Sequence, residues 1–335
     1  SLTTTKGDRP APGGSVPRRV RSYPHVVTPP SPDQQRSHRL GLLAAWSAYL
    51  IWGLFPLYFH ALEPSGAWEI LAHRIVWTLV VCLGVLLVRG ELVGLARLLR
   101  SRPRLALAVA LAAYVIAVNW GVYVYAVTQG RTHEAALGYF LNPIVTIALG
   151  VLVLRETLRP LQWVAVAIGA SAGIYLAVVA GTVPWISLVL AASFATYGLI
   201  KKRLGASLPA LQSLSAETVA LAPLAAGVLL WLGLTGVSTF TLDAPLHPAL
   251  LVLSGVVTAV PLVLFAESAR RIPLVTIGLI QFITPVAQLV IGLALLGEHM
   301  PSSRWVGFGI VWVALVVLSV DSVLAARRSR VSRRG

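Results

Sequence analysis

The sequence is poor in the residue types that soluble folds, disulfide-linked folds and metal sites require. Charged residues make up 12% of the chain, about half of their share in a typical soluble domain. Cys82 is the single cysteine among 335 residues. A disulfide within the chain is therefore impossible, and no cysteine and histidine ligands occur at a spacing that suits a metal. We expect a chain that is not water-soluble and that binds no metal or cofactor.

Sequence motifs of catalysis and nucleotide binding are absent as well. The chain has no HExxH motif, no P-loop, no pair of aspartates within an apolar segment and no nucleophile beside a base. Enzymatic activity and direct coupling to ATP are therefore not expected. An intramembrane enzyme remains an alternative, as does a polytopic channel or sensor.

Apolar residues dominate what is present. They make up 57% of the chain, and the mean hydropathy is +0.80. A membrane-spanning helix needs about 20 mostly apolar residues, with a range of about 17 to 25. Ten segments have this character, at residues 40–59, 69–88, 105–127, 134–154, 161–180, 184–200, 213–233, 248–268, 274–296 and 304–320. The sequence thus predicts an all-α integral membrane protein with ten transmembrane helices.

An internal repeat relates the two halves of the chain. Three pairs of landmarks share one offset of 142 residues: Pro143 and Pro285, Glu156 and Glu298, Trp163 and Trp305. We predict two five-helix repeats, residues 40–180 and 184–323. Because five is odd, the second repeat enters the membrane in the opposite sense, an arrangement typical of transporters whose site lies between the repeats. The alternative is a duplication that only built a stable bundle.

Basic residues alternate with the predicted spans. Of the 27 Lys and Arg residues, 24 fall in the terminal segments and in every second loop. This positive-inside pattern predicts that both termini face the cytoplasm. Residues 1–38 are predicted to form a disordered basic cytoplasmic tail, and residues 324–335 a second basic tail. The same distribution argues against a nucleic-acid partner despite the net charge of +15.

Ionisable residues in the second predicted span mark a candidate site, because such groups are costly in the bilayer core. Glu69, His73 and Trp77 follow one helical face, and Arg74 lies beside them. The Arg74 guanidinium could extend outward to lipid headgroups or turn inward to bind an anion, and the sequence leaves both open. Glu217, in the seventh span, lies on the other side of the midplane, so an ion pair between it and Arg74 is not expected.

The fourth and ninth spans carry equivalent polar faces. These are Tyr139, Asn142 and Thr146 in the first repeat, and Gln281, Thr284 and Gln288 in the second. Pro143 and Pro285 each lack an amide hydrogen and leave the carbonyl four residues earlier unpaired. Such a carbonyl is tolerated at membrane depth where it meets protein or a cavity. We predict that both faces line a cavity; kinks that serve only packing are the alternative.

The third span adds an amide and two aromatic rings, at Asn119, Trp120 and Tyr123. Asn119 and Tyr123 share one helical face, and an aromatic lining suits flat or amphipathic organic solutes. Ordinary helix packing is the alternative for these residues.

Two other motifs are interpreted as structural. Gly169 and Gly173 form a GxxxG pair, which indicates close helix packing more often than a specific dimer. Glu156 and Glu298 each precede a predicted helix, whose N-terminal dipole favours an acidic side chain.

At several of these positions the sequence resembles the RarD group of the EamA family, within the drug/metabolite transporter superfamily. The similar runs are Glu69–Arg74, Asn119–Trp120, Glu134–Pro143, Ser193–Leu199, Glu217–Thr218 and Gln281–Pro285. The resemblance implies a ten-helix permease of the bacterial inner membrane, in a group named for chloramphenicol sensitivity and with relatives that export amino acids or other metabolites. The family commonly has Gly-Glu after the fourth span, where this chain has Arg155-Glu156, so the local turn is expected to differ.

Together these patterns predict a secondary transporter that moves a small organic metabolite or drug-like solute by alternating access. Its expected partners are the substrate and the lipid bilayer, and coupling to protons or to a counter-transported solute is left open. The predicted substrate-binding residues are Arg74, His73, Asn119, Trp120, Tyr123, Tyr139, Asn142, Glu217, Gln281 and Thr284.

Overall fold

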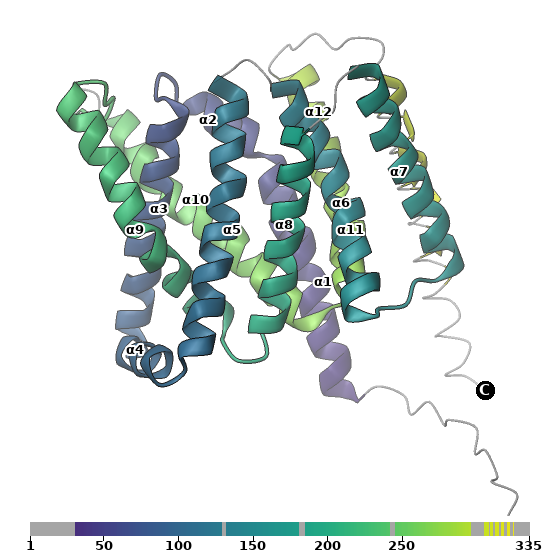
Figure 1. The fold of residues 1–335 in the computed structure, drawn as a ribbon, viewed down its shortest axis with the longest axis horizontal. Coiled ribbons are helices and arrows are strands. Elements are labelled where there is room, and N and C mark those ends of the chain that lie inside the picture. Colours follow the sequence, from purple (N-terminus) through teal and green to yellow (C-terminus); the bar gives the residue numbers. More distant parts are fainter. Residues whose placement is uncertain are drawn as a thin grey trace, which may run out of the picture.

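The computed structural model describes residues 31–128, 132–180, 185–241 and 245–295, together with most of residues 305–324. Every element within this part of the chain is a helix (Figure 1). The helices are α1 (Pro32–Gly53), α2 (Phe55–Ala61), α3 (Ala67–Val88), α4 (Leu92–Ser101), α5 (Pro103–Thr128), α6 (Thr132–Leu154), α7 (Pro160–Ala180), α8 (Trp185–Leu204), α9 (Ala210–Thr235), α10 (Leu246–Arg271), α11 (Leu274–Gln281) and α12 (Ile283–Ala294). The predicted all-helical fold is therefore confirmed.

Six helical segments are long and apolar enough to cross a membrane. They are Pro32–Ala61, Ala67–Val88, Pro103–Ala126, Pro160–Val179, Ala210–Thr235 and Leu246–Arg271. Shorter apolar helices occupy Gly138–Leu154, Leu274–Gln288 and Trp305–Ala314, and α8 coincides with the sixth predicted span. The tenth predicted span lies only partly within the described residues, and Glu298 lies outside them. The ten-helix inverted repeat therefore stays a prediction.

The largest helix contacts join the two halves of the chain. Helix α6 packs on α8 and α11, α3 packs on α9 and α10, α1 packs on α10, and α5 packs on α8. Each pair combines a helix before residue 180 with one after residue 184. The halves are interleaved rather than placed side by side, so a site in the centre of the bundle takes its walls from both.

Glycines allow the closest of these approaches. A Cβ atom at Gly255 of α10 would lie 2.4 Å from a backbone carbon of Trp77 in α3. In α7, a Cβ at Gly169 would lie 2.8 Å from the Phe282 ring, and one at Gly173 would lie 2.7 Å from Leu141. The GxxxG pair thus packs against other helices of the same chain, which confirms the packing interpretation.

The first and ninth predicted spans are each interrupted. The first breaks at Leu54 between α1 and α2, and the ninth at Phe282 between α11 and α12. Proline explains both breaks, because Pro56 and Pro285 follow the break points within three residues and cannot donate a backbone hydrogen bond. Pro143, in contrast, lies inside α6, which continues through it.

Side chains of α12 compensate the backbone of the broken first span. The ring of Pro56 frees the carbonyl of Trp52, and Gln288 Nε2 donates to that carbonyl at 3.2 Å. One turn earlier, Thr284 Oγ1 donates to the carbonyl of Tyr49 at 2.8 Å. The two interrupted helices therefore hydrogen-bond to each other beside their breaks.

Two local features differ from the sequence-based expectations. Helix α1 begins at Pro32, inside the segment 1–38 that was expected to be disordered, because Ser31 and Gln34 form a reciprocal capping box. Residues 1–30 and 325–335 lie outside the described part of the chain. The short amphipathic helix α4 was not predicted; it lies at the lower left of the bundle in Figure 1, and its own Leu95 is buried.

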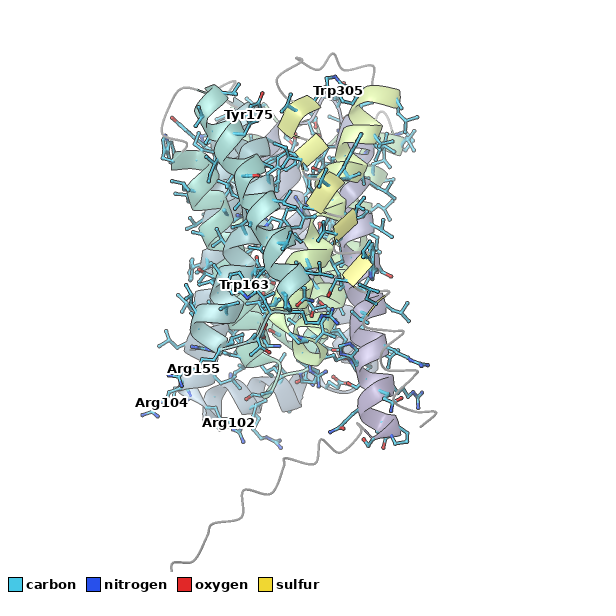
Figure 2. The ribbon with its side chains drawn as sticks, turned by 90° about the vertical axis from the view of Figure 1, so that its right-hand side faces the viewer. Arg102, Arg104, Arg155, Trp163, Tyr175 and Trp305 are labelled. Atoms are coloured by element: carbon cyan, nitrogen blue, oxygen red, sulfur yellow. The ribbon has the colours of Figure 1, made fainter. Side chains whose placement is uncertain are left out.

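The two ends of the bundle differ in charge. Figure 2 shows Arg102, Arg104 and Arg155 at one end, and Tyr175 and Trp305 toward the other. We call the end that carries Arg102, Arg104 and Arg155 the basic end. Helix α4 lies at the basic end, and α2 lies at the opposite end (Figure 1).

Candidate functional site

A cavity of about 450 Å³ lies in the centre of the bundle. Its walls come from α1 and α2, α3, α5 and α6 of the first half and from α8, α10, α11 and α12 of the second. This volume falls within the range of about 300 to 1,000 Å³ that is typical of sites for small organic ligands. The cavity includes exposed residues of α2 and the following turn, His60 and Glu63, so it opens at the end opposite the basic end.

Eight of the ten predicted binding residues line this cavity. They are Arg74, Asn119, Trp120, Tyr123, Tyr139, Asn142, Gln281 and Thr284. Of the six residues of the two polar faces of α6 and α11–α12, all but Thr146 line this one cavity. His73 and Glu217 are the two that lie elsewhere.

Arg74 turns into the cavity. Its Nε donates to Thr258 Oγ1 at 2.9 Å, and its guanidinium carbon lies 5.4 Å from the Trp120 ring centre and 5.5 Å from those of Phe55 and Phe59. Aromatic faces at this distance stabilise a cation. Within the described residues, no carboxylate lies within ion-pair distance of Arg74. The guanidinium is thereby held in place with donors left to bind an anionic group.

Polar atoms without partners also face the cavity. Asn142 Oδ1 and Tyr49 OH are buried and form no hydrogen bond within the described part of the chain. Asn119 is different, because its amide donates to the Leu190 carbonyl at 2.8 Å and to Ser193 Oγ at 2.9 Å, both on α8. A buried polar atom without a partner costs free energy, so a partner for the first two atoms would be favourable, whereas Asn119 braces α5 against α8.

An aromatic layer closes the cavity toward the basic end. The cavity-lining rings of Tyr49, Trp52 and Phe194 meet edge to face, with Trp52 at 5.2 Å from Tyr49 and 5.8 Å from Phe194. Beneath them, Phe265 stacks on Tyr197 at 5.9 Å, and both are 1% exposed. We call these five residues the aromatic layer.

Glu217 belongs to a buried polar cluster below the aromatic layer rather than to the cavity. Its Oε1 lies 2.5 Å from Lys201 Nζ, and Ser213 Oγ donates to the same oxygen at 2.7 Å. Tyr197 OH donates to Oε2 at 3.0 Å. Glu217 therefore lies outside the central cavity, and the binding role predicted for it stays a prediction. From the sequence, Lys201 was expected to lie in a loop. In the structure α8 extends to Leu204, and Lys201 is a buried residue of this helix.

His73 packs against the connection between α9 and α10. Its ring stacks on Phe240 at 4.9 Å and receives a hydrogen bond from Trp77 Nε1 at 3.2 Å. One turn earlier, Glu69 accepts hydrogen bonds from the Thr239 amide and from the hydroxyls of Ser238 and Thr239. The residues of this face of α3 therefore contact a loop, and His73 lies outside the central cavity. The binding role predicted for His73 stays a prediction.

Glu156 closes the basic end further. Its two carboxylate oxygens accept hydrogen bonds from the amides of Leu274 and Val275, at 2.9 and 2.8 Å. An acid capping a helix N-terminus was expected, but the helix is α11, more than a hundred residues away, and not the one that follows in sequence. The preceding Arg155 has φ = 54°, and the Glu156 amide donates to the Gly150 carbonyl. This is the helix ending in which glycine is usual.

Aromatic residues of the first span were missed as site residues. Tyr49, Trp52, Phe55 and Phe59 all line the cavity. Their spacing of three or four residues places them on one helical face, so the signal was present in the sequence. Phe194, also a lining residue, was likewise not predicted as a site residue. Among the described residues, no three His, Cys, Asp or Glu side chains meet in a way that could hold a metal.

Comparison with known proteins adds independent information. The profile of the EamA-like transporter family matches residues 39–179 and again residues 183–320. The chain is 51% identical to Protein RarD of Streptomyces exfoliatus over 296 residues, which cover 88% of this chain and 93% of that protein. It is 43% identical to an uncharacterized transporter of Pseudomonas aeruginosa, covering 87% of this chain and 96% of that one. A solved crystal structure with 15% sequence identity superposes with a TM-score of 0.64 and covers 85% of this chain and 98% of its own.

Proposed function

The chain belongs to the EamA-like transporter family, as a member of its RarD group, and we propose that it carries a small organic anion across the bacterial inner membrane by alternating access. Family membership makes it a multi-pass membrane transporter of the drug/metabolite class. The direction of the helices, the substrate class and the transport cycle are our proposal. We further propose that both termini face the cytoplasm, which the positive-inside pattern of the basic residues supports.

One observation carries the substrate class. Among the described residues, Arg74 is the only Lys or Arg that lines the central cavity, and no carboxylate pairs with it. A charge within a membrane protein is retained where it binds a substrate or a partner group. We assign Arg74 to a carboxylate or similar anionic group of the solute, and Asn142 and Tyr49 to its hydrogen-bonding groups.

The walls favour a solute with an apolar body. Trp52, Phe55, Phe59, Trp120 and Phe194 surround the cavity, and aromatic side chains bury a large apolar area with few rotamers. A solute with one anionic end and a flat apolar part fits both features. An aryl carboxylate and an aromatic amino acid belong to this class.

The cavity has the shape of one state of a transport cycle. It reaches the exposed residues of α2, whereas the aromatic layer and the cluster around Lys201 and Glu217 separate it from the basic end. With the basic end in the cytoplasm, this state is open to the outside. The breaks at Leu54 and Phe282 lie beside the cavity, where a few backbone torsions could change its access.

The experiment measures binding by tryptophan fluorescence in purified protein, because Trp52 and Trp120 line the cavity. Benzoate, phenylalanine and neutral chloramphenicol serve as probes. For an anionic probe, Arg74→Gln should weaken binding about 10- to 150-fold, because a charged hydrogen bond contributes about 1.5 to 3 kcal/mol. Asn142→Leu should weaken it about 2- to 10-fold. Arg97→Gln, an exposed arginine on α4, is the charge-matched control.

Uptake of the same probes into proteoliposomes then tests transport. Arg74→Gln should abolish the preference for anionic over neutral probes, while the Arg97→Gln control should transport as the wild type does. If Arg74→Gln and Asn142→Leu insert normally and transport every bound probe at the wild-type rate and half-saturation, the cavity is not the substrate site.

A further inference from the structure

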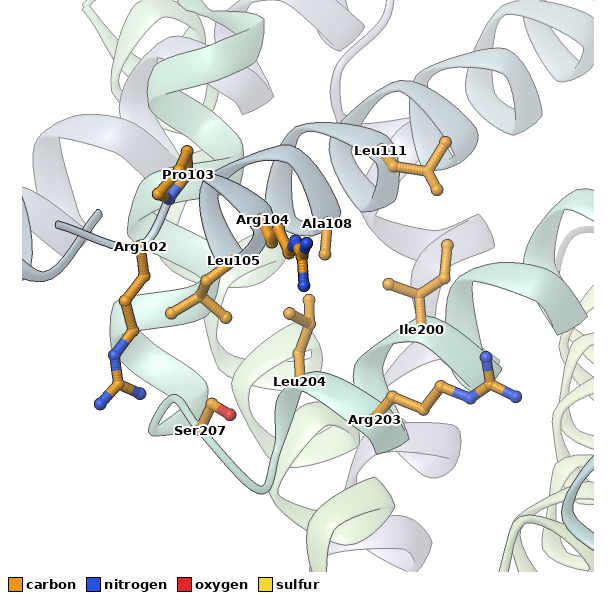
Figure 3. A pocket seen from close by; sticks show the side chains of 10 residues that line it. All are labelled: Arg102, Pro103, Arg104, Leu105, Ala108, Leu111, Ile200, Arg203, Leu204 and Ser207. Atoms are coloured by element: carbon orange, nitrogen blue, oxygen red, sulfur yellow. The ribbon is translucent and has the colours of Figure 1, made fainter. Parts of the chain in front are cut away.

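A second cavity, of about 680 Å³, lies at the basic end between α5 and α8, outside the central cavity (Figure 3). We call it the basic groove. Arg102, which directly precedes α5, and Arg104 in its first turn line the groove on one side, and Arg203 lines it from the last turn of α8. Its inner wall is apolar and includes Leu105, Leu111 and Ile200.

The charge of the basic groove is not neutralised by the protein. Among the residues that the structure describes, no acidic side chain lines the groove, and the three guanidinium groups form neither an ion pair nor a hydrogen bond. Arg102 and Arg104 also flank the N-terminus of α5, where the helix dipole adds positive potential and a cation is unfavourable. Figure 3 shows the Arg104 guanidinium over the middle of the groove and the Arg102 and Arg203 guanidinium groups toward its two sides. Three like charges and a positive helix end therefore border one groove, which suits an anion that carries more than one negative charge.

The apolar wall identifies the kind of anion. Leu111 is 53% exposed on the outer surface of α5, two turns along the helix from the arginines and toward the bilayer core. A free phosphate or a nucleotide would leave this wall unused. A phospholipid would use both parts, with phosphate against the arginines and acyl chains along Leu105, Leu111 and Ile200. Basic pockets between transmembrane helices on the cytoplasmic side are suited to such headgroups.

We propose that the basic groove binds an anionic phospholipid of the cytoplasmic leaflet, and that a headgroup with two phosphates, as in cardiolipin, fills it best. Such a lipid bridges the cytoplasmic ends of α5 and α8. Helix α8 carries Phe194 of the central cavity and Lys201 of the buried cluster, so a lipid bound here stabilises the closed basic end.

The test uses delipidated full-length protein in detergent, with lipid binding followed by native mass spectrometry and by the midpoint of thermal unfolding. Cardiolipin, phosphatidylglycerol, phosphatidylcholine and inorganic phosphate are added separately. Cardiolipin should bind and raise the midpoint most, phosphatidylglycerol less, and the other two should have no effect. Replacing all three arginines, as R102Q/R104Q/R203Q, should weaken cardiolipin binding about 100-fold, because each basic residue near a membrane surface contributes roughly fivefold.

Two further variants make the outcome specific to the groove. The control R89Q/R97Q/R100Q removes the same charge from the same end without touching the groove and should bind cardiolipin as the wild type does. Ala108→Trp fills the groove without changing charge and should also prevent binding. The proposal is overturned if both triple variants lose cardiolipin equally, if Ala108→Trp binds it normally, or if inorganic phosphate competes with it. None of these readouts depends on transport, so the proposed substrate site is tested separately.

Discussion

Separating Lys201 from Glu217 should destabilise the protein more than removing both charges together. Lys201 and Glu217 side chains are 1% and 2% exposed, so neither charge reaches water in this state. If one partner is removed, the other is left as a buried charge, which costs about 3 to 5 kcal/mol. Replacing both with apolar residues of similar volume removes the burial cost as well as the attraction, and is often neutral or stabilising.

The neighbouring hydroxyls predict which single change is worse. After Lys201→Met, the Glu217 carboxylate keeps two donors, Tyr197 OH and Ser213 Oγ. After Glu217→Leu, the Lys201 ammonium keeps one acceptor, Ser213 Oγ at 2.8 Å. We expect Glu217→Leu to cost about 4 to 5 kcal/mol and Lys201→Met about 3 kcal/mol. The double variant should fall within about 2 kcal/mol of the wild type.

The assay is the midpoint of thermal unfolding in detergent, followed by intrinsic fluorescence, for the wild type, both single variants and the double variant. Arg39→Met, an exposed position on α1, is the control and should change little. The expected order of midpoints is wild type, double variant, Lys201→Met and Glu217→Leu, with the first two close together. Additive effects in the double variant would refute the argument, because they would show that the two charges do not depend on each other.

Three further changes test other parts of the structure. Arg155→Gly should raise the midpoint of thermal unfolding, because it removes about 1 kcal/mol of strain at φ = 54°; a lower midpoint would show that the arginine side chain contributes more than the strain costs. Gly255→Ala should lose monodisperse protein in size-exclusion chromatography, because its methyl group would lie 2.4 Å from the backbone of α3. Gly84→Ala, with no atom within 4 Å, is its control, and equal yields would contradict the packing described. Reporter fusions after Ser65 should locate outside and fusions after Arg100 in the cytoplasm; the reverse would invert the proposed topology.

The polar faces could be predicted from the sequence because the duplication shows them twice. Asn142 alone is compatible with a packing kink, but Thr284 occupies the equivalent position of the second repeat, and both line the cavity. Arg74 needed the structure, since an arginine near a helix end can extend to headgroups or turn inward. The Phe55 and Trp120 rings beside the Arg74 guanidinium show that this side chain turns inward.

The contacts that close the cavity toward the basic end, those of Lys201 with Glu217 and of Glu156 with α11, could not be predicted from the repeat. The pairing of Lys201 with Glu217 depends on how far α8 extends, and helix ends are the least certain part of any sequence-based assignment. Glu156 was correctly expected to cap a helix, but a dipole argument identifies the kind of partner and not which helix supplies it. Helix α4 carries leucines at helical spacing, at Leu92, Leu95 and Leu99, and is too short to appear in a search for spans.

The cap that Glu156 forms on α11 also bears on why both halves occupy one polypeptide. Residues matched by the first copy of the family profile supply the carboxylate, and residues matched by the second supply the amides. If the two halves were separate chains, the hydrogen bonds from the α11 amides to Glu156 would form only after the chains associate. Their formation would then depend on the concentration of the chains in the bilayer. On one chain the two partners are covalently linked, so their effective concentration is set by that linkage and not by the amount of protein. The cap that Glu156 forms at the basic end is therefore independent of the expression level of the protein.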